Sequence, residues 1–315
     1  MLIGVPREIK ADEYRVGLTP TSVRELCAAG HQVLAETGAG QGIGMSDAAY
    51  NRAGAEIVGD ADELFARAEM IIKVKEPQPV ECARLREGQI LFTYLHLAPD
   101  PEQAAALVES GVIAIAYETV TAPDGSLPLL APMSEVAGRM AVQAAAHCLE
   151  REAGGAGILL GGVPGVRAAN VVVIGGGVVG TNAIRVAMGM EAQVTVIDRS
   201  LKRLQELDFQ FGGRLNTIFS TTEAVEEYAI DADVVVGAVL VVGAAAPRLV
   251  TRAMLGEMRD GSVLVDVAID QGGCFESSRP TTHSDPTFIE DGVVHYCVAN
   301  MPGAVPRTSA YALNN

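Results

Sequence analysis

Short apolar runs alternate along the chain with longer segments in which apolar residues recur at helical spacing. In the first part the apolar runs cover residues 2–4, 32–35, 70–74, 90–93 and 112–116. Short strands that alternate with helices of 10–15 residues are typical of a largely parallel sheet with helices on both faces. The pattern therefore predicts a doubly wound α/β domain.

A second alternating series follows a turn cluster at residues 122–128 and a long predicted helix at 133–152 that is rich in small residues. Its strands are nearly continuous apolar runs, as a sheet buried on both faces requires. They cover residues 171–174, 194–197, 217–219, 234–236, 263–265 and 293–297. Because turn clusters mark domain boundaries, we expect a first domain over 1–128 and a second over 129–306.

A glycine motif directly follows the predicted strand at 170–174. The sequence Gly175-Gly-Gly-Val-Val-Gly180 fits the pattern G-x-G-x-x-G and opens a predicted helix. In such a turn Gly175 makes the tight bend, Gly177 lets the backbone approach a pyrophosphate, and Gly180 lets the helix pack on the strand. The free N–H groups of the helix attract phosphate. The second domain is thus predicted to be a Rossmann domain that binds a dinucleotide.

Asp198 ends the next predicted strand and indicates which dinucleotide binds. An acid at this position accepts hydrogen bonds from the adenosine ribose and repels a 2′-phosphate. Arg199 and Arg203 lie close by and could accommodate that phosphate. We weigh the acid more heavily because it stands at the strand end itself, so the sequence favours NAD over NADP.

Composition and charge exclude several classes of partner. The 315 residues include 23 Lys and Arg against 39 Asp and Glu, a formal net charge of −16. A nucleic-acid or anionic membrane surface needs clustered positive charge, which the sequence lacks. The longest apolar run, 234–246, is shorter than the ~20 residues that a membrane span needs. The 5 scattered cysteines show no C-x-x-C spacing, which indicates free thiols in a reducing cytoplasm.

Four polar residues are candidates for chemistry. His96 and Asp270 each follow a predicted strand, where the ligand crevice of a doubly wound sheet lies. Lys75 emerges from another strand end, and Arg15 precedes a predicted helix. Each also has an ordinary interpretation: a loop histidine, an Asx turn before glycine, or a solvated surface cation. Spacing alone leaves both interpretations open.

Several strings taken together resemble the alanine dehydrogenase family, and the resemblance is collinear over all 315 residues. They are Arg15-Val-Gly-Leu-Thr-Pro20, Lys73-Val-Lys-Glu-Pro77, Tyr94-Leu-His-Leu97, Asp266-Val-Ala-Ile-Asp-Gln-Gly-Gly273 and Val298-Ala-Asn-Met-Pro-Gly-Ala-Val-Pro306. The resemblance implies two Rossmann-like domains, the first of which binds substrate. It also implies a cytoplasmic hexamer that converts L-alanine, NAD⁺ and water reversibly to pyruvate, ammonium and NADH.

The family's functional residues carry over by position. The resemblance implies that Arg15 and Lys75 bind substrate, that His96 is the acid/base, and that Asp270 assists proton transfer and handling of the imine. Besides the glycine motif, the residues it places against NAD are Ser134, Val178, Val179, Asp198, Arg203, Ser220, Val239, Leu240, Val267, Ala268, Ile269, Asp270, Val298, Ala299, Asn300 and Met301.

Family chains continue past Asn315, with helices that return to the first domain. Residues 307–315 are therefore expected to begin this return segment. The tail residues that the resemblance would assign to a metal near the cofactor do not occur in this sequence, so we expect no metal. We also expect the chain to bind NAD(H) but to be less stable and less active than a longer form.

Three rival functions share parts of the pattern. One is the NAD-binding component of a proton-translocating transhydrogenase, which resembles this chain around Arg15. Another is a lysine-forming saccharopine-type dehydrogenase, and the third is an NAD(H)-binding protein without full activity. The combination of His96 and Asp270 favours the dehydrogenase over the transhydrogenase component.

Overall fold

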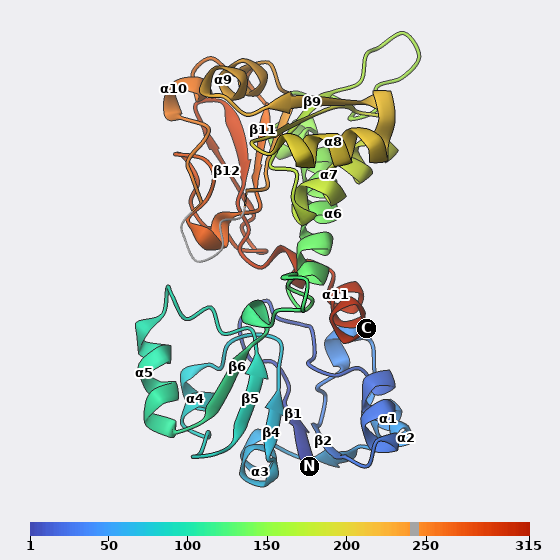
Figure 1. Ribbon diagram of the computed structural model, residues 1–315, viewed down its shortest axis with the longest axis vertical. Coiled ribbons are helices and arrows are strands. Elements are labelled where there is room, and N and C mark those ends of the chain that lie inside the picture. The colour runs from blue at the N-terminus through green and yellow to red at the C-terminus, as the bar shows by residue number, and fades with distance from the viewer. Residues whose placement is uncertain (240–245) are drawn as a thin grey trace. The chain divides into compact units, whose positions relative to one another are not determined.

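The computed structural model describes residues 1–239 and 246–315, which form two compact units (Figure 1). Unit 1 comprises Met1–Met133 and Pro302–Asn315, and unit 2 comprises Ser134–Met301. The division falls inside helix α6 (Ala131–Cys148), just after the turn cluster that predicts a boundary at 128. Met133 packs with the apolar core of unit 1, whereas the next buried turns of α6 pack in unit 2.

Unit 1 contains, among the residues that the structure describes, a parallel sheet with the strand order β3-β2-β1-β4-β5-β6. The order reverses between β1 and β4, and ligands of doubly wound sheets bind at this point. The strands are β1 (Leu2–Val5), β2 (Gln32–Glu36), β3 (Glu56–Val58), β4 (Met70–Ile72), β5 (Ile90–Thr93) and β6 (Ile113–Ala116). The α-helices wholly within this unit are α1 (Pro20–Ala28), α2 (Asp47–Ala53), α3 (Ala61–Arg67), α4 (Pro79–Cys82), α5 (Pro101–Ser110) and α11 (Pro306–Asn314).

Capping residues set where these helices begin and end. The side chain of Thr19 accepts a hydrogen bond from the backbone N–H of Ser22, and Pro20 occupies the first turn of α1, as the sequence predicts. Helix α5 begins after Asp100, whose carboxylate accepts from the Gln103 N–H at 2.9 Å. It ends at Gly111, whose φ of 66° is the left-handed conformation that favours glycine.

Helix α11 attaches the last residues of the chain to unit 1. Ala310 is buried with the core beneath β1 and β2, and Leu313 packs in a second cluster. The side chain of Asn314 accepts from the Thr19 N–H at 2.9 Å and donates to the Gly17 carbonyl at 3.2 Å. Figure 1 shows α11 beside the α1 side of the unit 1 sheet. Unit 1 is thus built from two segments that are distant in sequence.

Unit 2 has the strand order β12-β13-β11-β10-β7-β8-β9 within the described residues. Neighbouring strands are parallel except β12 and β13, which are antiparallel. The strands are β7 (Asn170–Ile174), β8 (Gln193–Asp198), β9 (Leu215–Phe219), β10 (Val234–Gly237), β11 (Val263–Asp266), β12 (Thr287–Glu290) and β13 (Val293–Tyr296). The α-helices besides α6 are α7 (Val178–Gly189), α8 (Leu201–Phe211), α9 (Thr222–Ile230) and α10 (Arg252–Leu255).

Both faces of the unit 2 sheet are covered, as its continuous apolar strands predict. Along β7, Val171 and Val173 pack in one core cluster, and Val172 and Ile174 pack in another. Successive side chains of a strand point to opposite faces, so each cluster fills one face of the sheet. The burial of both faces explains why β7 has no polar alternation.

Two short strands lie outside the predicted set, β3 and β12. Both are at the edge of their sheet, and most of their residues are exposed or only partly buried. An edge strand buries little apolar surface and needs no continuous apolar run. The hydrophobic pattern therefore gives little signal for either strand.

The small residues of α6 serve a close helix contact within unit 2. A Cβ on Gly138 would overlap the backbone carbonyl of Val179 on α7. Ala137, Ala141 and Ala145 are buried in the same core. None of the helices in the described residues is long and apolar enough to cross a membrane.

His295 is an ionisable residue in the core of unit 2. It is 0% exposed on β13, and its ring stacks on Phe288 with centroids 4.6 Å apart. Its Nδ1 lies 2.9 Å from the Val293 carbonyl, which can only accept, so Nδ1 carries the proton. Its Nε2, at 2.7 Å, then accepts from the Ser277 hydroxyl. Burial lowers the pKa of His295 and so favours this neutral form.

This histidine should make unit 2 sensitive to acid. Its folded-state pKa is depressed, so its contribution to stability is present above the ordinary pKa of about 6.5 and is lost as the pH falls. As the pH falls below 6.5 the free energy of unfolding should therefore decrease, because the unfolded chain takes up a proton on this residue before the folded chain does. Urea denaturation of both proteins measures this free energy, which should depend less on pH in His295→Gln than in the unmodified protein. The exposed His147, changed to Gln, is the control and should keep the original slope.

Candidate functional site

The glycine turn after β7 has the geometry of a dinucleotide cradle. Gly175 has a φ of 100°, and a Cβ there would lie 2.7 Å from the Ala238 carbonyl oxygen. A Cβ on Gly180 would overlap the carbonyl oxygen of Gly175. At Gly177, by contrast, a Cβ would meet nothing within 4 Å. The chain itself requires Gly175 and Gly180, whereas the open space at Gly177 suits the approach of a pyrophosphate.

Both polar backbone groups of Gly176 are held by side chains. The carboxylate of Asp198 accepts from the Gly176 N–H at 2.7 Å and from the Ser200 N–H at 2.8 Å. The guanidinium of Arg203 donates to the Gly176 carbonyl at 2.6 Å and to the Thr181 hydroxyl at 2.6 Å. Arg203, which the sequence offers as a possible partner for a 2′-phosphate, is thus engaged with the glycine turn.

The other residues expected at the cofactor lie mostly past the carboxyl ends of parallel strands, as a nucleotide crevice requires. Ser220 follows β9, and its N–H donates to the Asp198 carbonyl at 3.0 Å. Residues 267–270 follow β11, and 298–301 follow β13. Ser134 stands on α6, Val178 and Val179 open α7, and Val239 follows β10. Leu240 lies outside the described residues.

In unit 1, Arg15 is buried and held by an acid. Its side chain is 2% exposed, and its Nε and Nη2 donate to the two carboxylate oxygens of Glu13 at 2.7 and 2.6 Å. A third donor, Nη1, lies 3.1 Å from the sulfur of Met133. The guanidinium is therefore fixed in one orientation.

His96 is fixed by two carboxylates. Its φ is 47°, in the left-handed region, where a side chain is strained. The carboxylate of Glu118 accepts from the backbone N–H of His96 at 2.7 Å and from that of Leu95 at 3.1 Å. The imidazole Nδ1 lies 3.2 Å from the carboxylate of Glu76, and the ring stacks on Tyr94.

Glu76 determines which nitrogen of His96 carries the proton. Burial raises the pKa of Glu76, but the hydrogen bond from His96 and the charges of Lys75 and Lys10 outweigh it and hold the pKa far below its usual range. Lys10 also forms an ion pair with this carboxylate. An ionised carboxylate can only accept, so Nδ1 of His96 carries a hydrogen, and in the neutral imidazole the lone pair is on Nε2. The imidazole is thus oriented as a base through Nε2.

Lys75 belongs to the same cluster. It is buried, its charge acts on Glu76, and its backbone carbonyl accepts from the Thr93 hydroxyl at 2.8 Å. Arg15 acts electrostatically on Tyr94, the residue against which His96 stacks. The structure thus gathers Lys75 and His96 around Glu76, with Arg15 close to Tyr94.

Three acids of this cluster escape the sequence analysis: Glu13, Glu76 and Glu118. Glu76 stands in the string Lys73-Val-Lys-Glu-Pro77, directly after the candidate cation Lys75. An acid beside the candidate cations was the signal that could have identified it. Glu118 lies 22 residues from the histidine that it holds, so no local pattern indicates its role.

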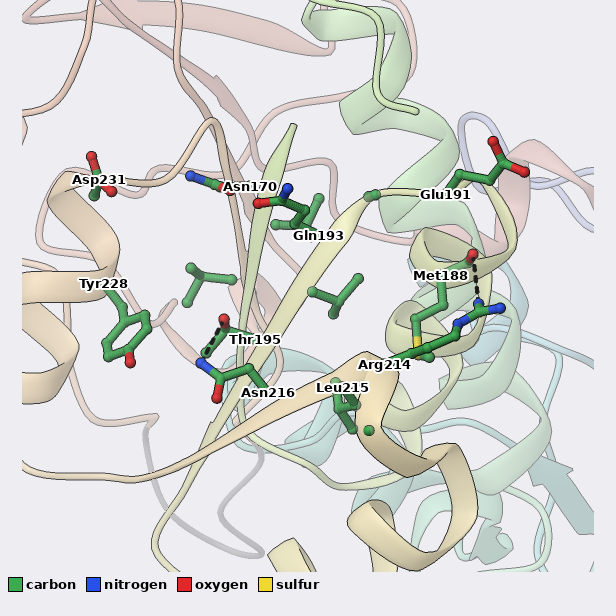
Figure 2. A pocket seen from close by; sticks show the side chains of 15 residues that line it. Asn170, Met188, Glu191, Gln193, Thr195, Arg214, Leu215, Asn216, Tyr228 and Asp231 are labelled. Atoms are coloured by element: carbon green, nitrogen blue, oxygen red, sulfur yellow. Dashed lines mark hydrogen bonds between the residues drawn. The ribbon is translucent and has the colours of Figure 1, made fainter. Parts of the chain in front are cut away.

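A separate cavity of about 710 Å³ lies at the amino-terminal ends of three strands of the unit 2 sheet. Figure 2 shows Asn170, Gln193 and Leu215 around it, which are the first residues of β7, β8 and β9. The glycine turn and Asp198 stand at the other ends of these strands. The cavity is therefore distinct from the cofactor crevice.

Two family models match this chain: "Alanine dehydrogenase/PNT, N-terminal domain" over residues 4–137 and "Alanine dehydrogenase/PNT, C-terminal domain" over residues 141–315. The chain belongs to the alanine dehydrogenase/PNT family. The resemblance found in its sequence motifs is thereby confirmed, and so is the predicted α/β architecture with mostly parallel sheets.

Individual relatives agree with this membership. The alanine dehydrogenase of Halomonas elongata is 62% identical over 315 residues, which are 100% of this chain and 85% of the relative. A solved L-alanine dehydrogenase structure is 53% identical with a TM-score of 0.97, over 100% of this chain and 87% of that one. A solved transhydrogenase from Sinorhizobium meliloti is 27% identical with a TM-score of 0.87, over 100% of this chain and 90% of that one.

The glycine turn gives a matched pair of substitutions. Gly180→Ala should lower the free energy of unfolding by about 2 kcal/mol or more, because its Cβ must displace the backbone of Gly175. Gly177→Ala should lower it by less than about 1 kcal/mol, since nothing surrounds its Cβ and the cost is only the weaker preference of alanine for the N-cap of α7. Chemical denaturation of the ligand-free variants measures both. Equal destabilisation by the two substitutions would contradict this account of the turn.

Proposed function

We propose that the chain is an NAD-dependent alanine dehydrogenase, which converts L-alanine and water reversibly to pyruvate and ammonium. The cluster of Arg15, Lys75, His96 and Glu76 carries the proposal, because it lies where the unit 1 strand order reverses. Cations suited to a small carboxylate and an imidazole with a defined tautomer meet there. The identity to alanine dehydrogenases over the full length of this chain supports the same activity.

Substrate recognition is assigned to the two buried cations. Arg15 binds the carboxylate of alanine through its planar guanidinium, which Glu13 holds in a fixed plane. Lys75 binds the amino or carbonyl region. Because both side chains are already ordered, little conformational entropy is lost when the substrate binds.

Proton transfer is assigned to His96, with Asp270 assisting on unit 2. The Nε2 lone pair of His96 accepts a proton from the substrate side in deamination and returns it in the reverse direction. Glu76 stabilises the imidazolium that forms, since its negative charge lies beside Nδ1. The left-handed backbone of His96 and the hydrogen bonds that its N–H and that of Leu95 donate to Glu118 fix the direction in which the ring points.

The glycine turn of unit 2 fits NAD, as the open space at Gly177 and the acid at Asp198 indicate. When bound, the cofactor supplies the redox chemistry by accepting a hydride from the substrate Cα. The chain holds it through the N–H groups that open α7 and through Asp198 at the ribose. Residues 267–270 and 298–301, with Ser134 and Ser220, are assigned to its remaining contacts.

We also propose a homohexamer that acts in the cytoplasm, as the resemblance to alanine dehydrogenases implies. All five cysteines lie in the described part of the chain and have free thiols, which suits a reducing compartment.

An activity assay tests the proposal directly. The purified chain should form NADH from L-alanine and NAD⁺, and it should not do so with L-lysine in place of L-alanine. His96→Ala and Asp270→Asn should each lower turnover by ~100-fold, the usual scale for loss of an acid/base group. His147→Ala on the exposed end of α6 is the control and should leave turnover unchanged. Near-normal alanine oxidation by His96→Ala would refute the assigned role.

Cofactor preference should depend on the charge of Asp198. The unmodified protein should strongly prefer NAD⁺ over NADP⁺, because a 2′-phosphate would face the carboxylate. Asp198→Asn preserves the shape but removes the charge, and the preference should narrow by about tenfold or more. Ser200→Ala alters the neighbouring helix cap and keeps the charge, so its preference should stay that of the parent. Steady-state kinetics with both cofactors gives the ratio.

A further inference from the structure

Asp266 is a buried acid to which the proposed mechanism assigns nothing. It ends β11 and is 0% exposed. The residue that the mechanism uses, Asp270, lies four positions later in the short 3-10 helix η5 (Ile269–Gln271) and is exposed. We propose that Asp266 is the positioning residue that holds the turn carrying Asp270. This inference rests on the proposed function of Asp270.

The Asp266 carboxylate ties together the two ends of that turn. It accepts from the Ala268 N–H at 3.0 Å, where the turn begins, and from the Cys274 N–H at 2.7 Å, where it ends. The hydroxyl of Ser278 donates to the same carboxylate. Burial raises the pKa of Asp266, and the hydrogen bonds from Ser278, Cys274 and Ala268 act in the opposite direction. The two N–H groups and the hydroxyl thus all donate to the Asp266 carboxylate, which accepts through both of its oxygens.

The backbone of the turn fits closely around this carboxylate. Gly272 and Gly273 have φ values of 91° and 82°, and the N–H groups of Gln271 and Gly273 both donate to the Ala268 carbonyl. A Cβ on Gly273 would lie 2.7 Å from an oxygen of Asp266. Glycine is therefore required at position 273 for two reasons: a side chain would collide with the Asp266 carboxylate, and the positive φ disfavours other residues. Displacement of the carboxylate would release both ends of the loop.

A carboxylate is required at this position because every hydrogen-bonding neighbour donates. An asparagine would direct an NH₂ group at the N–H of Ala268 or at that of Cys274, so at least one of these hydrogen bonds would be lost. The buried Ile269 still anchors the centre of the turn. We therefore expect Asp266→Asn to loosen the turn while the β11 core keeps its packing. A displacement of about 1 Å at a reacting group can cost ~100-fold in rate.

Hydrogen–deuterium exchange of the ligand-free chain tests the structural part. In Asp266→Asn the amides of Ala268 and Cys274 should exchange at least about tenfold faster, with β11 and β10 unchanged. The matched control is Asp233→Asn, because Asp233 is also buried and accepts a backbone N–H, that of Asn170 at 2.8 Å, at the opposite end of β10. It should loosen its own contact and leave residues 267–274 protected. Unchanged exchange in Asp266→Asn overturns the proposal.

A double-mutant cycle tests the positioning role. Asp266→Asn should lower kcat by about tenfold or more in the parent and by less than about twofold in the Asp270→Asn background, because it acts through Asp270. Equal effects in both backgrounds would mean an independent role and overturn the inference. A parent that forms no NADH from alanine would instead refute the proposed function, and the exchange measurement would still decide whether Asp266 holds the turn.

A second variant keeps the test decisive if Asp266→Asn fails to fold. Ser278→Ala removes one donor and retains the carboxylate. It should raise the exchange of the Cys274 amide and lower kcat by about two- to fivefold, again only while Asp270 is present. An equal loss of kcat in Asp233→Asn, which lies outside the site, would show a general effect of stability and overturn the proposal.

Discussion

The interaction on which both units depend is a carboxylate that accepts backbone N–H groups just past the end of a strand. Such N–H groups lack the ladder partners that they would have within the sheet, and a buried one without a partner costs free energy. Glu118 serves the segment after β5 in this way, Asp198 the turn after β7, and Asp266 the turn after β11. Each of these segments carries a residue assigned to proton transfer or to the cofactor. Part of the strongly acidic composition is therefore structural.

Buried carboxylates of unit 1 also form ion pairs with a buried lysine. Lys73, which is fully buried, contacts Glu8 at 2.9 Å and Glu81 at 2.8 Å, and this triad holds the segment that continues to Lys75. The carboxylate of Glu8 also accepts from the Val74 N–H at 2.6 Å. Loss of one partner of such a group would leave an uncompensated buried charge, which is strongly destabilising. The position of this segment is thus maintained by acids that are themselves buried.

The sequence predicted the features that follow from hydrophobic periodicity, helix capping and the glycine motif. It missed the features that depend on contacts between residues distant in the chain. The buried strands, the Thr19 cap and the steric demand at Gly175 and Gly180 follow from local pattern, and the structure has them. Strands β3 and β12 are edges with weak apolar signal. The left-handed backbone of His96 and the acids around it arise from residues far apart in the chain, so local pattern could not reveal them. Family resemblance supplied the candidate roles of His96 and Asp270, and their surroundings came only from the structure.

The hydrogen bonds between Asn314 and the Gly17–Thr19 backbone have a consequence for biosynthesis. A ribosome delivers residues 134–301 as one uninterrupted stretch, so unit 2 has every strand it needs before translation ends. Unit 1 must wait, because Ala310 and Leu313 join its core only after residues 134–301 have been synthesised. Domains generally fold as units in the order in which they are completed. Here the order of completion is inverted, and the amino-terminal sheet matures last.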